Sequence, residues 1–316
     1  MREVLMCISK GASRHHDSSK SAGCGWRICH APLDPADIEG LWTLATLGPP
    51  HYLGARQMAF TGKVALVTGG ASGMGKVAAL RLAASGARVA IFDMNEKALQ
   101  EVAAASPNIR TWKCNVADWE EVRERVADVE RELGPIDRLT HAAGIMPSYA
   151  VIDTTLEQAR RLIDVNYFGT LHMIRAVVPS MLERDRGDVI LFGSISGMAL
   201  TPKLGAYAAS KAAVNVLGET LANELAHTAL RIAVVLPPAV NTPLIEQSLN
   251  TDAAQALREA RKSGRLSDPE KIVTQIETGL EKGRKAIYPG EAKFLELWHT
   301  LAPRLWWKTV LQFEKR

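Results

Sequence analysis

The sequence predicts an α/β fold built on one doubly wound parallel sheet in a single domain. Short apolar runs alternate with helical patterns from residue 63 onward, and the first run ends abruptly in a cluster of glycines. Alternation of this kind implies right-handed crossovers between parallel strands. With 316 residues, of which 47% are hydrophobic and 23% charged, the chain is long enough to bury the core of such a domain.

The turn after the first expected strand has the spacing of a phosphate-binding site. Residues 64–67 are predicted to form a strand buried on both faces, and a helix is expected to begin near Gly75. Gly69 would allow the sharp turn, Gly73 would let the backbone approach a pyrophosphate, and Gly75 would let the helix pack against the strand. The N–H groups at the start of the helix would face the anion. This arrangement is typical of the Rossmann fold.

The second expected strand, residues 88–92, is followed by a carboxylate that bears on cofactor choice. Asp93 stands about 20 residues beyond the glycines, where a carboxylate hydrogen-bonds an adenosine ribose. It would repel a 2′-phosphate by about 1 kcal/mol per charge pair in water, and by about 4 kcal/mol at an effective dielectric of about 20, for a separation of about 4 Å. Because Met94 rather than a base follows, NAD is the predicted cofactor, although Lys76 could weaken this preference.

The remaining elements alternate along a domain that is expected to extend from residue 58 to about residue 290. The apolar runs are short and bounded by Gly, Asp, Asn or Pro, as central parallel strands are. Further strands are expected at residues 109–114, 139–143, 189–192, 232–236 and 287–289, and helices at 75–85, 95–104, 118–133, 155–184 and 206–228.

Residues 1–57 differ from the rest, since they show neither helical nor alternating periodicity. We expect this extension to be disordered or loosely packed, and three origins stay open: a translated upstream stretch, a flexible extension or a targeting peptide. Three of the four cysteines lie here, and the pair Cys24 and Cys29 fits no common zinc spacing, so no metal site is predicted. The main body holds only Cys114, which suits a reducing, cytoplasmic environment.

Charge and hydropathy argue against two classes of partner. The formal net charge of +4 is too small for a chain of this size to indicate nucleic-acid binding. The sequence also lacks a run of eighteen or more apolar residues, which a membrane-spanning helix would need.

A second group of residues predicts proton transfer at an alcohol or a carbonyl. Tyr207 and Lys211 stand four positions apart at the start of an expected helix, so that the hydroxyl and the ammonium share a face. A tyrosine at its usual pKa of about 10 is a poor base at neutral pH, and a nearby cation lowers that pKa. Ser194, just after the strand at residues 189–192, would hold a substrate oxygen by a hydrogen bond. The chemistry implied is acid–base catalysis beside a nicotinamide.

Several residues follow one another in a specific order over residues 60 to about 245: the glycine turn, Asp93, Ala142-Ala143-Gly144, Asn166, Ser194, Tyr207 and Lys211. Together they resemble the short-chain dehydrogenase/reductase family. The resemblance implies that Tyr207 is the general acid/base, that Lys211 lowers its pKa and binds the nicotinamide ribose, and that Ser194 orients the substrate oxygen. Asn166 resembles the family asparagine whose backbone carbonyl holds a water in a proton relay.

The resemblance implies further contacts with the cofactor. Val240 and Thr242 would meet the nicotinamide carboxamide and the phosphates, and Asn115 and Val116 fall where the family contacts adenine. The cofactor-binding residues predicted from the turn and the resemblance are Gly69, Ser72, Gly73, Met74, Gly75, Asp93, Asn115, Val116, Ala143, Gly144, Tyr207, Lys211, Val240 and Thr242.

Three residues depart from the family pattern. His141 stands where the family usually has an asparagine that steadies the central strands, and we expect a structural substitution rather than a second base. Asn115 replaces the usual Asp, and its amide oxygen can still accept from the adenine amino group. Pro238 replaces the usual Gly after Pro237, which removes an N–H and fixes φ near about −65°. The shape of this nicotinamide-side loop is therefore open.

Two segments beyond the cofactor-binding core bear on the substrate and on partners. Residues 242–264 are expected to form a helix-rich lid with a mostly apolar inner side, which favours a lipophilic alcohol or ketone. In residues 291–316, Pro303 is expected to separate two short amphipathic helices rich in aromatic residues. This tail either makes a peripheral membrane contact or packs on its own domain or a sister subunit. The resemblance also implies a homodimer or homotetramer.

The sequence thus predicts an NAD-dependent oxidoreductase, a carbonyl reductase that interconverts a secondary alcohol and a ketone by hydride transfer. Two alternatives stay open. One is an epimerase or dehydratase that uses the nucleotide without net redox change, and the other is a dinucleotide-sensing or scaffolding protein that acts through its tail. A pure scaffold has no need of the full set Asn166, Ser194, Tyr207 and Lys211.

Overall fold

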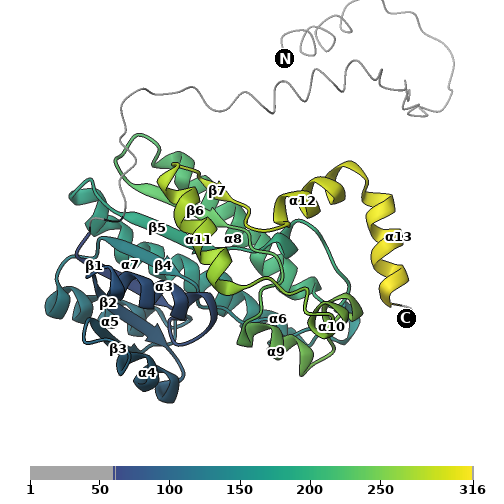
Figure 1. The fold of residues 1–316 in the computed structure, drawn as a ribbon, viewed down its shortest axis with the longest axis horizontal. Helices are drawn as coiled ribbons and strands as arrows, with labels where there is room; N and C mark the ends of the chain where they lie inside the picture. Colours follow the sequence, from purple (N-terminus) through teal and green to yellow (C-terminus); the bar gives the residue numbers. More distant parts are fainter. Residues whose placement is uncertain (1–59, 61, 315–316) are drawn as a thin grey trace, which may run out of the picture. The chain divides into compact units, whose positions relative to one another are not determined.

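The structure is a computed structural model that describes residue 60 and residues 62–314. The extension predicted at residues 1–57 lies outside these residues. Seven described strands form one sheet in the order β3-β2-β1-β4-β5-β6-β7, and every neighbouring pair is parallel (Figure 1). The strands are β1 Val64–Thr68, β2 Arg88–Asp93, β3 Ile109–Lys113, β4 Arg138–His141, β5 Asp188–Phe192, β6 Arg231–Val235 and β7 Ala286–Ile287. The predicted doubly wound parallel sheet is confirmed.

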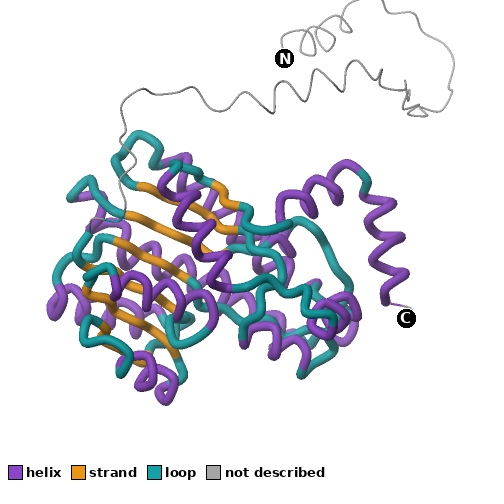
Figure 2. The backbone as a smooth tube through the Cα atoms, viewed as in Figure 1, coloured by secondary structure: helices purple, strands orange, loops and turns teal. Residues whose placement is uncertain are grey.

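Helices cover both faces of this sheet, as Figure 2 shows in purple beside the orange strands. One face packs against α5, α7 and α8, and the other packs against α3, α4 and α11. The helices are α3 Gly73–Ala84, α4 Glu96–Ala103, α5 Trp119–Leu133, α6 Leu156–Ile163, α7 Gly169–Glu183, α8 Gly205–Glu224, α9 Pro243–Leu249, α10 Gln255–Lys262, α11 Pro269–Glu281, α12 Ala292–Leu301 and α13 Pro303–Glu314.

Burial on both faces explains why the strands are continuously apolar. In β1, Val64 and Leu66 pack into the cluster on the side of α5 and α7, while Ala65 and Val67 pack into the cluster on the side of α3 and α4. Successive strand residues point to opposite faces, so a strand covered by helices on both sides needs an apolar residue at every position.

Several element boundaries differ from the prediction, and three of the differences lie next to predicted site residues. The helix after the glycine turn begins at Gly73 rather than near Gly75, with Ser72 as its N-cap residue. The helix expected over residues 155–184 is divided into α6 and α7 by a π-helical turn at Asp164–Phe168, where the Gly169 N–H bonds the Asp164 carbonyl. The strand expected at residues 139–143 is shifted to β4, which ends at His141.

A buried ion ladder crosses the first residues of three strands. Arg138, Asp188 and Arg231 are neighbours in register on β4, β5 and β6. The Arg138 side chain is 1% exposed, and its Nη2 donates to Asp188 Oδ2 at 2.9 Å while Nη1 donates to Glu277 of α11 at 2.9 Å. Arg231 Nε donates to the other Asp188 oxygen at 2.6 Å. Paired charges can be buried here because each finds opposite charge and hydrogen bonds.

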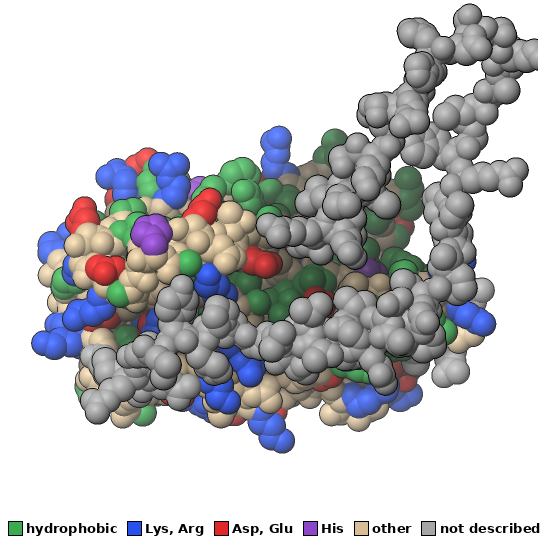
Figure 3. Space-filling model, turned by 90° about the horizontal axis from the view of Figure 1, so that it is seen from above, with side chains coloured by type: hydrophobic (Ala, Val, Ile, Leu, Met, Phe, Trp, Pro, Cys, Tyr) green, Lys and Arg blue, Asp and Glu red, His purple; other side chains and the backbone are tan. Residues whose placement is uncertain are grey.

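The last part of the described chain is helical. The residues expected as a lid contain α9 and α10, and the predicted pair of tail helices is found as α12 and α13, with Pro303 as the first residue of α13. Among residues 60 and 62–314, the helices lack the length and apolar character needed to cross a bilayer. On the coloured part of the face in Figure 3, Lys and Arg side chains are scattered among Asp and Glu.

Candidate active site

The glycine turn between β1 and α3 has the backbone geometry that a phosphate cradle requires. Gly69 has φ +63° and Gly73 has φ +51°, a left-handed conformation that favours glycine. A Cβ on Gly75 would collide with the Gly69 carbonyl oxygen, so close packing of the helix on the turn needs glycine there. A Cβ on Gly73 would lie 3.1 Å from the Thr242 side chain across the site. The turn at Gly69 and the close packing at Gly75 agree with the roles predicted for them, and the approach of a pyrophosphate to Gly73 stays a prediction.

A groove of about 500 Å³ runs along the carboxyl ends of the strands beside this turn. Most of the predicted cofactor residues line it, namely Gly69, Ser72, Gly73, Met74, Gly75, Asp93, Asn115, Val116, Ala143, Gly144 and Thr242. The groove therefore fits a dinucleotide, because its turn offers glycine backbone to phosphates and its far end offers a carboxylate to a ribose.

The Asp93 carboxylate is held in position by the backbone. Its Oδ2 accepts from the Ala71 N–H at 3.2 Å, and its Oδ1 accepts from the Asn95 N–H at 3.0 Å. The first bond ties the end of β2 to the glycine turn. Asn115 is also engaged locally, since its Oδ1 accepts from the Ala117 N–H at 3.1 Å. A carbonyl oxygen has two lone pairs, so this bond leaves one for an adenine amino group.

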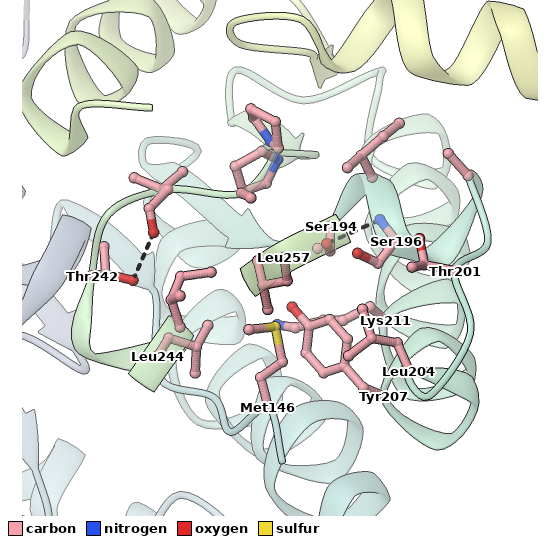
Figure 4. Close-up of a pocket in the computed structure, with 18 of the residues that line it drawn as sticks. Met146, Ser194, Ser196, Thr201, Leu204, Tyr207, Lys211, Thr242, Leu244 and Leu257 are labelled. Atoms are coloured by element: carbon pink, nitrogen blue, oxygen red, sulfur yellow. Dashed lines mark hydrogen bonds between the residues drawn. The ribbon is translucent and has the colours of Figure 1, made fainter. Parts of the chain in front are cut away.

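A second cavity, of about 260 Å³, adjoins the groove and shares Met74, Gly144 and Thr242 with it. Figure 4 shows Ser194, Tyr207 and Lys211 around this cavity with apolar side chains such as Leu257. Its polar lining side chains are Ser194, Ser196, Thr201, Tyr207, Lys211 and Thr242, and Val240 also lines it. The structure therefore brings the predicted catalytic hydroxyls and lysine together in one cavity.

Burial governs the proton equilibria of these groups. Burial raises the pKa of Tyr207 to about 12, and a hydrogen bond with the Ser194 side chain opposes part of this rise. Burial lowers the pKa of Lys211 to about 8. Lys211 Nζ donates to the Phe192 carbonyl at 2.7 Å, and the effect of its charge on the Tyr207 pKa stays a prediction.

The Ser194 hydroxyl is available as a donor. Its oxygen accepts from the Ser196 N–H at 3.1 Å, so the hydroxyl proton can bond the Tyr207 oxygen or a substrate oxygen. Asn215 of α8 fixes the backbone of the same residue, with Oδ1 accepting from the Ser194 N–H at 3.1 Å and Nδ2 donating to its carbonyl at 3.0 Å. Ser194 is thus held against the helix that carries Tyr207.

Asn166 is fully buried in the π-helical turn, and its side chain connects two segments of the site. Oδ1 accepts from the Ile145 N–H at 2.9 Å, and Nδ2 donates to Ser210 Oγ at 2.9 Å. A Cβ on Gly144 would lie 3.1 Å from Asn166 Oδ1. The Asn166 carbonyl, which was expected to hold a relay water, accepts from Thr170 Oγ1 at 2.6 Å.

The two remaining departures from the family pattern are His141 and Pro238. His141 is 1% exposed and outside the residues that line either cavity, and its Nδ1 lies 2.7 Å from Thr68 Oγ1 of β1. This bond joins β4 to β1, as expected of a residue that steadies the central strands. Pro237 and Pro238 both line the smaller cavity, and the Pro237 carbonyl accepts from the Ile195 N–H at 3.2 Å.

Some lining residues were not predicted. Arg161 and Asp164 line the groove, and the signal that could have found them is that they precede Asn166 on the same helical segment. Leu295 of α12 and Trp306 of α13 line the smaller cavity. No local pattern indicates this, because an amphipathic tail does not reveal which surface its apolar side will cover.

Comparison with known proteins agrees with this geometry. The family model described as short chain dehydrogenase matches residues 63–253. An uncharacterised oxidoreductase of Staphylococcus saprophyticus is 41% identical over 187 residues, which cover 58% of this chain and 80% of that protein. A glycine betaine reductase of Emericella nidulans is 35% identical over 221 residues, which cover 68% of this chain and 17% of that protein.

Solved structures give the same result. A short-chain dehydrogenase from Streptomyces avermitilis superposes with a TM-score of 0.69 at 29% identity, covering 81% of this chain and 99% of that one. A 3-ketoacyl-(acyl-carrier-protein) reductase from Brucella melitensis, solved with NADH, superposes with a TM-score of 0.64 at 25% identity, covering 72% and 96%. The chain therefore belongs to the short-chain dehydrogenase family and is an oxidoreductase that binds a nicotinamide dinucleotide.

Proposed function

We propose that this protein is an NAD-dependent dehydrogenase/reductase that interconverts a lipophilic secondary alcohol and the corresponding ketone. The observation that carries the proposal is the presence of the Ser194 and Tyr207 hydroxyls in one mostly apolar cavity that adjoins the nucleotide groove. Two hydroxyls can hold and protonate a single carbonyl oxygen, and the apolar wall can receive the carbon chains on either side of it.

The catalytic residues have separate tasks in this proposal. When bound, the dinucleotide supplies or accepts the hydride. Ser194 donates a hydrogen bond to the substrate oxygen, and Tyr207 gives a proton to that oxygen in reduction or removes it in oxidation. Lys211, whose pKa burial lowers to about 8, remains mostly charged at neutral pH, and this charge favours loss of the Tyr207 proton.

The Asp93 carboxylate supports the preference for NAD. It lines the groove, and two backbone N–H groups hold it in place, so it cannot easily turn away from a 2′-phosphate. Replacing its charge would remove the like-charge repulsion worked out above, about 1 to 4 kcal/mol. Arg161 lines the same groove and offers a base that could meet a phosphate, so the preference has to be measured as a ratio.

The test is absorbance at 340 nm with the full chain, NAD or NADP, and panels of secondary alcohols and ketones of increasing hydrophobicity. We expect turnover with NAD and lipophilic substrates. Tyr207→Phe should abolish turnover while leaving NADH binding intact, as measured by nucleotide fluorescence. NADH binding by the wild-type protein without turnover on any panel would favour the dinucleotide-sensing alternative, and a fully active Tyr207→Phe variant would refute the role given to Tyr207.

We further propose that the protein acts in the cytoplasm as a homodimer or homotetramer. Cys114, the single cysteine among residues 60 and 62–314, is a buried free thiol, which suits a reducing compartment. Phe168 and Val216 leave apolar surface exposed on the helical segments around Asn166 and Tyr207, where a second copy could pack. Light scattering of wild type and of Val216→Asp would test this: an unchanged mass would refute the contact.

A further inference from the structure

The two C-terminal helices form part of the wall of the catalytic cavity. Leu295 of α12 and Trp306 of α13 line the same cavity as Ser194 and Tyr207. Both lie beyond residue 253, where the match to the family model ends. The wall of the substrate cavity therefore includes a segment that lies outside the region matched by the family model.

The Trp306 side chain is fixed in one orientation. It is 6% exposed, and its Nε1 donates to the Leu200 carbonyl at 2.7 Å, in the loop that follows Ser194. Its ring meets the Trp298 ring edge to face, with centroids 5.2 Å apart, and the His299 ring with centroids 5.7 Å apart. An indole held by a hydrogen bond and by two rings makes a rigid wall rather than an adaptable one.

The other end of α13 is tied to α10, which also lines the cavity. Glu314 Oε1 accepts from the Gln255 N–H at 2.6 Å, at the start of α10, where the N-cap residue Ala254 has no side chain that could cap the helix. Leu257 of α10 lines the cavity. Helix α13 thus connects the Leu200 loop to the lid helix α10.

We propose that α13 is a strap across the substrate cavity and that Trp306 is a specificity-determining residue, which limits the bulk of the apolar group on the ketone or alcohol. This proposal rests on the proposed function. Trp306 acts through shape alone, because its N–H is already bonded to Leu200. Removing the indole should therefore change which substrates bind and leave the chemistry at Tyr207 unchanged.

The experiment compares Trp306→Ala, Trp306→Phe and the control Leu305→Ala on straight-chain methyl ketones of increasing length, with NADH as reductant. Leu305 is the exposed neighbour of Trp306 and is outside the cavity lining. We expect Trp306→Ala to raise the ratio of kcat/KM for long over short ketones at least tenfold, mainly through KM, with little change in kcat. Trp306→Phe should give an intermediate ratio, and Leu305→Ala the wild-type ratio.

Calorimetric titration of the same ketones into the NADH complex measures selectivity even where turnover fails. If the wild type binds ketones without reducing them, the proposed reaction is wrong. The proposal for α13 and Trp306 is then tested by the ratio of the affinities for long and short ketones. If Trp306→Ala keeps the wild-type melting temperature and loses affinity equally for all ketones, the role proposed for Trp306 is wrong.

A separate observation concerns the outer side of the same two helices. Large apolar side chains here face solvent: Phe294, Leu297, Leu301, Leu305 and Leu311, with Phe294 63% and Leu301 68% exposed. Arg304 and Lys308 are exposed on the same side of α13 as Leu305 and Leu311. On α13 the apolar and basic side chains therefore share one outward side.

We infer that this outer face of α12 and α13 contacts an anionic lipid bilayer. Apolar side chains with basic neighbours on one helical face suit the boundary between headgroups and acyl chains. Charge complementarity favours this occupant, because Arg304 and Lys308 would face acidic headgroups, and each such base contributes to attraction near a negative surface. The surface lies on the helices that also line the substrate cavity, so a lipophilic substrate could pass between bilayer and site.

Co-sedimentation with phosphatidylcholine vesicles, with and without phosphatidylserine, tests this inference. We expect binding to the anionic vesicles to fall at least fivefold in Leu301→Asp/Leu305→Asp and in Arg304→Glu/Lys308→Glu. Leu156→Asp is the matched control, because Leu156 is an apolar side chain 90% exposed on α6, outside the tail. The inference is wrong if the wild type does not bind the vesicles or if all variants bind them equally. It is also wrong if Leu301→Asp/Leu305→Asp forms a smaller oligomer, because that result would indicate that a second copy of the chain covers this face.

Discussion

His141 should make the folded protein less stable as the pH falls. The ring is 1% exposed, its Nδ1 is engaged with Thr68, and its Nε2 has no partner among the described residues. Burial, together with the nearby positive charge of Lys211, lowers the pKa of His141 to about 3. In the unfolded chain the same group titrates near its usual value of about 6.5.

The sign and size of the effect follow from proton linkage. Between pH 6.5 and pH 3 the unfolded chain holds one proton more than the folded chain at this position, so acidification favours unfolding. The free energy of unfolding should fall by up to about 1.4 kcal/mol per pH unit within this window. Between pH 7.0 and pH 5.5 the contribution of His141 amounts to about 1.2 kcal/mol.

The assay is urea unfolding of wild type and His141→Asn at both pH values. Asparagine keeps a polar group that can bond Thr68, and it does not titrate. Between pH 7.0 and pH 5.5 the free energy of unfolding of the wild type should fall by about 1.2 kcal/mol more than that of the variant. This expectation does not depend on how far the two stabilities differ at pH 7.0. Equal losses in the two proteins would refute the reasoning, because they would mean that the folded state accepts the proton at His141.

Three further predictions concern the nucleotide groove and the sheet. Asp93→Ser should shift the ratio of kcat/KM for NAD over NADP at least about tenfold toward NADP, measured at 340 nm; an unchanged ratio would show that the carboxylate does not face the ribose. Gly75→Ala should weaken NADH binding in fluorescence titrations, because its Cβ would collide with the Gly69 carbonyl and displace the turn, and wild-type affinity would contradict this. Asp188→Asn should lower the free energy of unfolding, measured with urea, by about 3 to 5 kcal/mol, because two guanidinium groups lose the carboxylate that they share. A decrease of less than about 1 kcal/mol would indicate that solvent reaches the ion ladder.

The sequence alone was sufficient for the features that depend on neighbours along the chain. The turn at Gly69, Gly73 and Gly75 needs particular backbone angles and close approaches within a few residues, and these needs select glycine wherever the chain folds in this way. Asp93 is the last residue of its strand, so its place at the edge of the groove follows from the strand itself. Tyr207 and Lys211 share a face because one helical turn separates them.

The features that join distant segments depend on tertiary packing, which no local sequence pattern indicates. The ladder of Arg138, Asp188 and Arg231 depends on the register of three strands. The pKa values of Tyr207 and Lys211 depend on how much water the surrounding elements exclude, and burial raises the first and lowers the second.

The C-terminal helices are the clearest case of this distinction. Their amphipathic pattern indicated two helices separated at Pro303 and left open what their apolar side would cover. The structure brings Trp306 into the catalytic cavity, and leaves Leu301 exposed on the outer side. The hydrophobic effect is non-directional. An amphipathic pattern therefore predicts that one face of a helix will be buried, but it does not indicate which part of the protein that face packs against.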